Sequence, residues 1–84
     1  MNDKTITKLF ENYMECGYDT VTIYLSDSTY HTFELYNTLH RYTIQDGLLR
    51  ITKLPQKMKW GEMTKKQEIT IFIDKIEKII TKEW

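Results

Sequence analysis

The spacing of apolar residues changes once along this chain, near Gly17, and that change limits the folds open to it. Before Gly17, apolar side chains recur three and four residues apart, which places them on one face of a helix. They are Ile6, Leu9, Phe10, Tyr13 and Met14. Asn2 or Asp3 can cap the start of this helix, and Gly17 can adopt the left-handed conformation that ends it. The pattern predicts a helix over residues 4–16.

After Gly17, apolar and polar residues alternate, as they do on half-buried strands. In "VTIYLSDSTYHTFEL", residues 21–35, two alternating runs are joined by Ser26-Asp27-Ser28, which predicts a hairpin. A second hairpin is predicted from "RYTI" and "LLRITKL", because the Asp46-Gly47 pair between them is favoured in tight turns. Pro55 follows directly, where it removes no ladder hydrogen bond.

The C-terminal stretch predicts one strand and leaves the next element open. Ile69, Ile71 and Ile73 alternate with polar or aromatic neighbours, which is typical of a strand. Residues 74–83 fit either a short helix capped by Asp74 or a tight turn at Asp74-Lys75 followed by a strand. The strand is favoured, because a helix of eight or nine residues is poorly nucleated.

These elements predict a small α+β fold: an N-terminal helix packed on a strongly twisted antiparallel sheet of four to five strands. A sheet this small must be covered on one face or close on itself, so the helix would act as a lid or a plug. The length of 84 residues predicts a single domain, 1–84.

The helix followed by "VTIYLSDSTYHTFEL" resembles the opening of the Sm-like and Hfq-like small barrels. The ending "ITIFIDKIEKII", taken as strand, tight turn and strand, is similar to the paired last strands of those proteins. The resemblance implies an Sm/SH3-like barrel as one form of the sheet. It also implies an RNA- or DNA-binding function.

Composition argues against several classes of function. Cys16 is the single cysteine, so no intrachain disulfide can form, and a cytoplasmic protein is expected. No signal-peptide core and no membrane span of about 18 apolar residues is present. His31 and His40 have no metal-ligand or nucleophile partner at a recognisable spacing. We therefore expect no enzyme, cofactor, metal site or small-molecule substrate. The absence of alanine and the abundance of Ile, Lys, Thr and Tyr suggest an AT-rich genome, as in many low-GC bacteria and their phages and plasmids.

The segment "LPQKMKWGEMTKK", residues 54–66, is the strongest candidate for a binding site. Trp60 would be a rigid anchor and Met58 and Met63 adaptable flanks, while the surrounding lysines would steer a partner. Those lysines are Lys57, Lys59, Lys65 and Lys66. Residues 51–66 carry five lysines against one glutamate, a net +4 in a chain of zero net charge. Trp84 is a second candidate anchor.

Five interpretations of this segment stay open. As a protein contact, it makes the chain a non-enzymatic interaction module, a phage or mobile-element accessory protein acting on a host or self protein. In the second interpretation, the chain is an Sm-like RNA- or DNA-binding protein that contacts nucleic acid through the lysine-rich 53–66 segment. Leu54, Met58 and Trp60 could instead close an open end of the sheet, or Trp60 could be buried in a homo-oligomer. "MKW" also alternates, so the segment could be an extended hairpin. The neutral net charge favours the protein contact.

Overall fold

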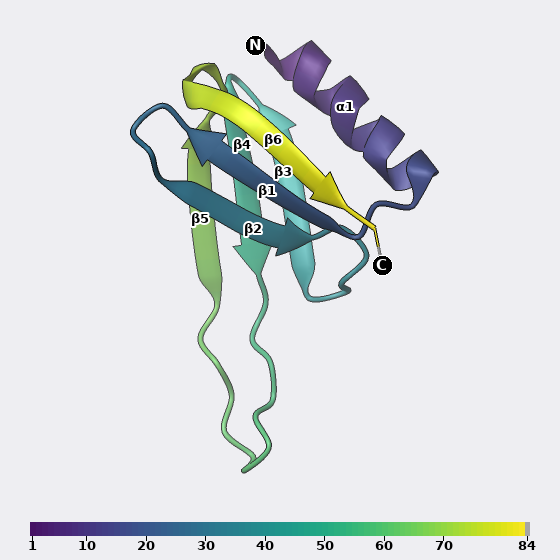
Figure 1. The fold of residues 1–84 in the computed structure, drawn as a ribbon. Helices are drawn as coiled ribbons and strands as arrows, with labels where there is room; N and C mark the ends of the chain where they lie inside the picture. The colour runs from purple at the N-terminus through teal and green to yellow at the C-terminus, as the bar shows by residue number, and fades with distance from the viewer. Residues whose placement is uncertain (84) are drawn as a thin grey trace.

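The computed structural model describes residues 1–83, so Trp84 lies outside the described residues. One helix is followed by six strands and a short 3-10 turn (Figure 1). In chain order the elements are α1 Asp3–Cys16, β1 Thr20–Leu25, β2 Tyr30–Glu34, β3 His40–Gln45, β4 Leu48–Lys53, β5 Gln67–Phe72, η1 Ile73–Lys75 and β6 Ile76–Lys82.

Helix α1 begins one residue before the predicted start and ends at the predicted residue, Cys16. The side chain of Asn2 accepts a hydrogen bond from the Thr5 N–H at 2.9 Å, which caps the first turn. Gly17 takes φ +76°, and its N–H donates to the Met14 carbonyl at 3.2 Å. Ile6 and Phe10, from the predicted stripe, are fully buried.

The strands form two three-stranded antiparallel sheets, in the orders β2-β1-β6 and β3-β4-β5. Both predicted hairpins are present, as β1–β2 and β3–β4. Asp46 and Gly47 have φ values of +54° and +76°, as a two-residue hairpin turn with two left-handed positions requires. Residues 76–82 form a strand, the interpretation that the sequence favoured.

Over residues 1–83 the six strands form two sheets instead of the predicted single sheet of four to five strands, and they do not close into the barrel considered as one form of that sheet. Two short connections divide the strands. Between β2 and β3 the chain turns at Asn37, whose side chain accepts from the Leu39 N–H at 2.8 Å and whose carbonyl accepts from the His40 N–H at 3.0 Å. Between β5 and β6, η1 carries the chain from one sheet to the other, so the last two strands do not pair with each other.

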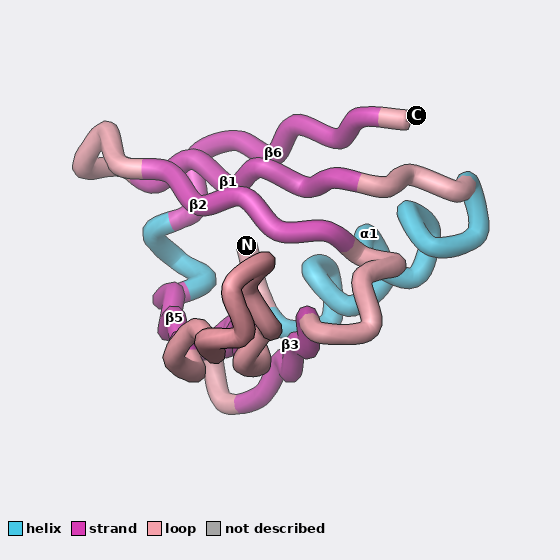
Figure 2. The backbone as a smooth tube through the Cα atoms, turned by 90° about the horizontal axis from the view of Figure 1, so that it is seen from below, coloured by secondary structure: helices cyan, strands magenta, loops and turns pink. Residues whose placement is uncertain are grey.

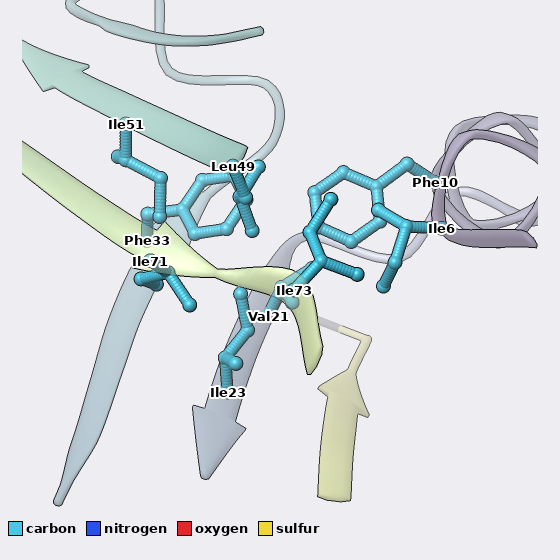
Figure 3. Close-up of a cluster of buried hydrophobic side chains, with 9 residues drawn as sticks. All are labelled: Ile6, Phe10, Val21, Ile23, Phe33, Leu49, Ile51, Ile71 and Ile73. Carbon is cyan, nitrogen blue, oxygen red and sulfur yellow. The ribbon is translucent and has the colours of Figure 1, made fainter. Parts of the chain in front are cut away.

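The two sheets face each other as layers, and α1 lies along one side of the opening between them (Figures 1 and 2). The core between the two sheets contains buried side chains from the helix and from both sheets (Figure 3). The ring of Phe10 from α1 contacts Phe33 of β2 and Tyr42 of β3, with centroid distances of 5.8 and 5.0 Å. The helix therefore closes one side of the space between the two sheets (Figure 2), whereas the prediction placed it over the face of a single sheet. The remaining buried side chains are Ile6, Val21, Ile23, Leu49, Ile51, Ile71 and Ile73.

Candidate functional site

Residues 54–66, which we call the arm, form an extended hairpin that projects beyond the two sheets (Figure 1). The last ladder pair of β4 and β5 is Lys53 opposite Gln67, and the arm has an isolated antiparallel bridge between Lys57 and Met63. Both pairs belong to the same register, so the arm continues the β4–β5 hairpin. The N–H of Thr64 donates to the Gln56 carbonyl at 2.8 Å, which joins the two sides between these pairs. The interpretation as an extended hairpin is confirmed.

The tip of the arm is a tight turn that places Lys59 and Trp60 at its centre. The N–H of Gly61 donates to the Met58 carbonyl at 3.0 Å, and the N–H of Met58 donates to the Glu62 carbonyl at 2.6 Å. Gly61 has φ +88°, a left-handed value, as expected for the last residue of a three-residue hairpin loop. The backbone therefore holds Trp60 at the far end of the molecule.

The apolar side chains of the arm are exposed. The exposed fraction is 69% for Trp60, 60% for Met63 and 39% for Met58. Only Leu54, at the base, is half-buried, and its N–H donates to the Leu39 carbonyl at 2.7 Å. The interpretation in which Met58 and Trp60 close one end of the sheet is wrong, because the register carries both residues away from the core.

All seven predicted site residues lie on or beside this arm. Lys57, Lys59, Lys65 and Lys66 are exposed. Lys66 lies 3.9 Å from the Glu68 carboxylate, and both side chains are more than half exposed, so this ion pair contributes little to stability. The structure thus brings an exposed tryptophan, two methionines and four lysines together on one projecting hairpin.

Side chains at the base of the arm hold β2, β3 and β4 together. The Nδ1 atom of His40 accepts a hydrogen bond from the Glu34 N–H at 3.0 Å, and the Lys53 ammonium donates to the Thr32 carbonyl at 3.1 Å. The pKa of His40 is lowered, chiefly by burial and also by the charge of Lys53. The Glu34 carboxylate has the opposite, smaller effect. His40 is neutral in this arrangement, because a protonated Nδ1 cannot accept a hydrogen bond.

No local sequence signal predicts this role for His40. Its partner is a backbone N–H six residues away, across a turn whose shape depends on Asn37. Nothing in the spacing of His40 relative to polar or apolar neighbours marks such a contact.

Residues 1–83 contain no cluster of three or more side chains that could hold a metal ion. The Cys16 thiol is exposed and contacts Asn12 of its own helix, at 3.8 Å from the amide oxygen. Over the same residues, no helix has the length and apolar character needed to cross a membrane.

Comparison with protein-family models, with curated proteins and with solved structures finds no match for this chain.

Proposed function

We propose that this protein is a non-enzymatic interaction module that docks the tip of its arm onto a partner protein. The observation that carries the proposal is the 69% exposure of Trp60 at the end of an ordered hairpin. Tryptophan is enriched among the side chains that contribute most of the binding energy of protein interfaces. It contributes this energy by filling a pocket on the partner.

The form of the arm supports this function. Its backbone is already fixed by hydrogen bonds and by the turn at Gly61, so binding would order little of the chain. Met58 and Met63 flank the tip with flexible apolar side chains that adapt to the shape of a partner surface. The lysines belong at the rim of such a contact, where they steer an acidic partner and keep their hydration.

The alternative function is binding of RNA or DNA through the 53–66 segment. A two-stranded ribbon fits the major groove of DNA, and an exposed aromatic ring can stack on an unpaired base. The zero net charge of the whole chain favours the protein partner, since nucleic-acid-binding domains usually carry a strong basic excess. The resemblance to Sm-like barrels, a cytoplasmic location and a phage or mobile-element origin stay predictions from the sequence pattern and composition.

Site-specific photocrosslinking tests the proposal. A photoreactive phenylalanine analogue at position 60, in the full chain, is expected to form a protein adduct in extract of the source cell. The same group at Thr43, an exposed position of β3 outside the arm, is the matched control. Equal protein adducts from both positions, or none from position 60, would contradict the proposal.

A salt titration separates the two functions. If the four arm lysines neutralised four phosphates of a single strand, raising salt from about 50 to about 200 mM would weaken binding about fiftyfold. A K57A/K59A/K65A/K66A variant would then lose binding. No binding of short RNA or DNA at the lower salt concentration is the result expected for a protein-docking arm.

A further inference from the structure

We propose that the partner of the arm is a second copy of this chain, which receives the tip in an acidic groove at the opposite end of the molecule. The proposal rests on the proposed function, because it names a partner for the same arm. The residues that define the acidic groove are Met1, Asp3, Asp46, Leu48, Phe72 and Asp74.

The acidic groove has the size and the apolar floor needed to accept a large side chain. Its volume is about 480 Å³, within the range of about 300–1,000 Å³ typical of binding pockets. Phe72 is 61% exposed and Met1 56% exposed, while Leu48 is half-buried beside them. An aromatic ring so exposed on a strand is an apolar surface without a partner in this molecule.

The rim of the groove is acidic and its shape is fixed by hydrogen bonds. The two carboxylate oxygens of Asp3 accept from the Gly47 N–H at 2.9 and 3.1 Å, and the Gly47 carbonyl accepts from the Ile73 N–H at 2.9 Å. These contacts join α1, the β3–β4 turn and η1. Asp46 and Asp74 are exposed beside them, so the rim is net negative even with an amine at Met1.

The arm and the acidic groove are complementary. The arm presents Trp60 and two methionines with lysines around them, and the groove presents Phe72 and Leu48 with carboxylates around them. Docking would bury Trp60, which is 69% exposed, against Phe72, which is 61% exposed. It would also place opposite charges at the rim, where they orient the contact.

The arm cannot reach the groove of its own molecule. The groove lies at the Asp46-Gly47 end of β4, and β4 ends at Lys53, where the arm begins. The arm extends away from that end of β4 (Figure 1). The six residues of β4 alone separate these ends by about 20 Å, and the arm extends further in the same direction. The occupant of the groove must therefore come from another molecule.

The positions of the arm and the groove allow two copies of the chain to dock onto each other reciprocally. One arm tip buries less than the roughly 1,200 Å² typical of a specific interface. Two copies lying antiparallel, each with its arm in the groove of the other, double the contact and close the assembly with twofold symmetry. The fold, 42 Å in its longest dimension, places arm and groove at opposite ends as this exchange requires.

Charge reversal of each surface tests the proposal by sedimentation velocity. The arm variant is K57E/K59E, and the groove variant is D46N/D74K, in which asparagine suits the left-handed φ at position 46. The wild-type chain is expected to self-associate between about 10 µM and about 1 mM. Its association should weaken at least about tenfold when salt rises from about 50 to about 300 mM.

Each variant alone is expected to be monomeric, because its arm and groove then repel or lack attraction. An equimolar mixture of the two is expected to associate, since a lysine-bearing arm meets an acidic groove and a glutamate-bearing arm meets a basic one. The control K8E/K82E, changed at exposed lysines outside the arm, should associate as the wild type does.

A wild-type chain that stays monomeric at the highest concentration would overturn self-docking. So would a mixture that stays monomeric when the wild type associates, or a K57E/K59E variant that associates normally. If self-docking fails, the photocrosslinking result decides whether the arm docks onto a different protein. An adduct from position 60 to a different protein would then support docking onto that protein, and no adduct would remove both proposals.

Discussion

His40 gives the clearest pH response expected of a single residue. Its folded-state pKa is lowered, chiefly by burial and also by Lys53. Neutral His40 therefore makes its full contribution to the free energy of unfolding above the ordinary histidine pKa of about 6.5. This contribution is lost as pH falls from there through the folded-state pKa. The free energy of unfolding should fall in this window. In His40→Gln, whose amide oxygen can still accept from the Glu34 N–H, that part of the pH dependence should be flatter.

Denaturant unfolding at several pH values measures this effect, with His31→Gln as the matched control because His31 is the other histidine of the chain. A His40→Gln variant that keeps the full wild-type pH dependence would contradict the role assigned to His40.

Two aromatic residues should differ sharply in their effect on stability. Trp60→Ala is expected to change the free energy of unfolding by less than about 0.5 kcal/mol, because Trp60 is 69% exposed. Phe10→Ala should cost about 3–5 kcal/mol, because Phe10 is fully buried among Phe33 and Tyr42. Urea unfolding followed by circular dichroism measures both values. A loss of several kcal/mol in Trp60→Ala would mean that Trp60 packs on the body of the protein.

At the level of secondary-structure elements, the arm should be separable from the rest of the fold. Gln56 and Thr64 face each other in the register of the arm, so residues 57–63 can be replaced by Asn-Gly, a two-residue hairpin turn. The melting temperature is expected to stay within about 4 °C of the wild-type value, because no core side chain is removed. Self-association should be lost. Cooperative unfolding at a much lower temperature would show that the arm supports the core.

The sequence predicted the elements that depend on local signals. The helix follows from its apolar stripe, the Asn2 cap and Gly17, and the β3–β4 hairpin follows from Asp46-Gly47. The division into two sheets depends on contacts between distant residues, such as Thr20 opposite Lys82, and no local pattern encodes such a pairing. For the arm, the sequence marked the segment and left the exposure of Trp60 and Met58 open, because both residues would suit a core plug or a partner contact equally well.

At the scale of the whole molecule, charge and apolar surface are separated along its length. The arm carries a net positive charge around Trp60, and the opposite end carries Asp3, Asp46 and Asp74 around Phe72. The zero net charge of the chain conceals this separation. Association driven by these two ends should weaken as salt rises, because salt screens the attraction between exposed charges.

The exposure of Trp60 tests the central claim most directly. In a Trp84→Phe chain, Trp60 is the sole tryptophan, so its fluorescence reports on the tip of the arm alone. In dilute solution we expect emission typical of a water-exposed indole, with strong quenching by iodide. We expect a blue shift and loss of quenching when the tip docks, whether on a second copy or on another protein. Blue-shifted, unquenched emission from the dilute monomer would contradict the account, because Trp60 would then be buried in its own fold.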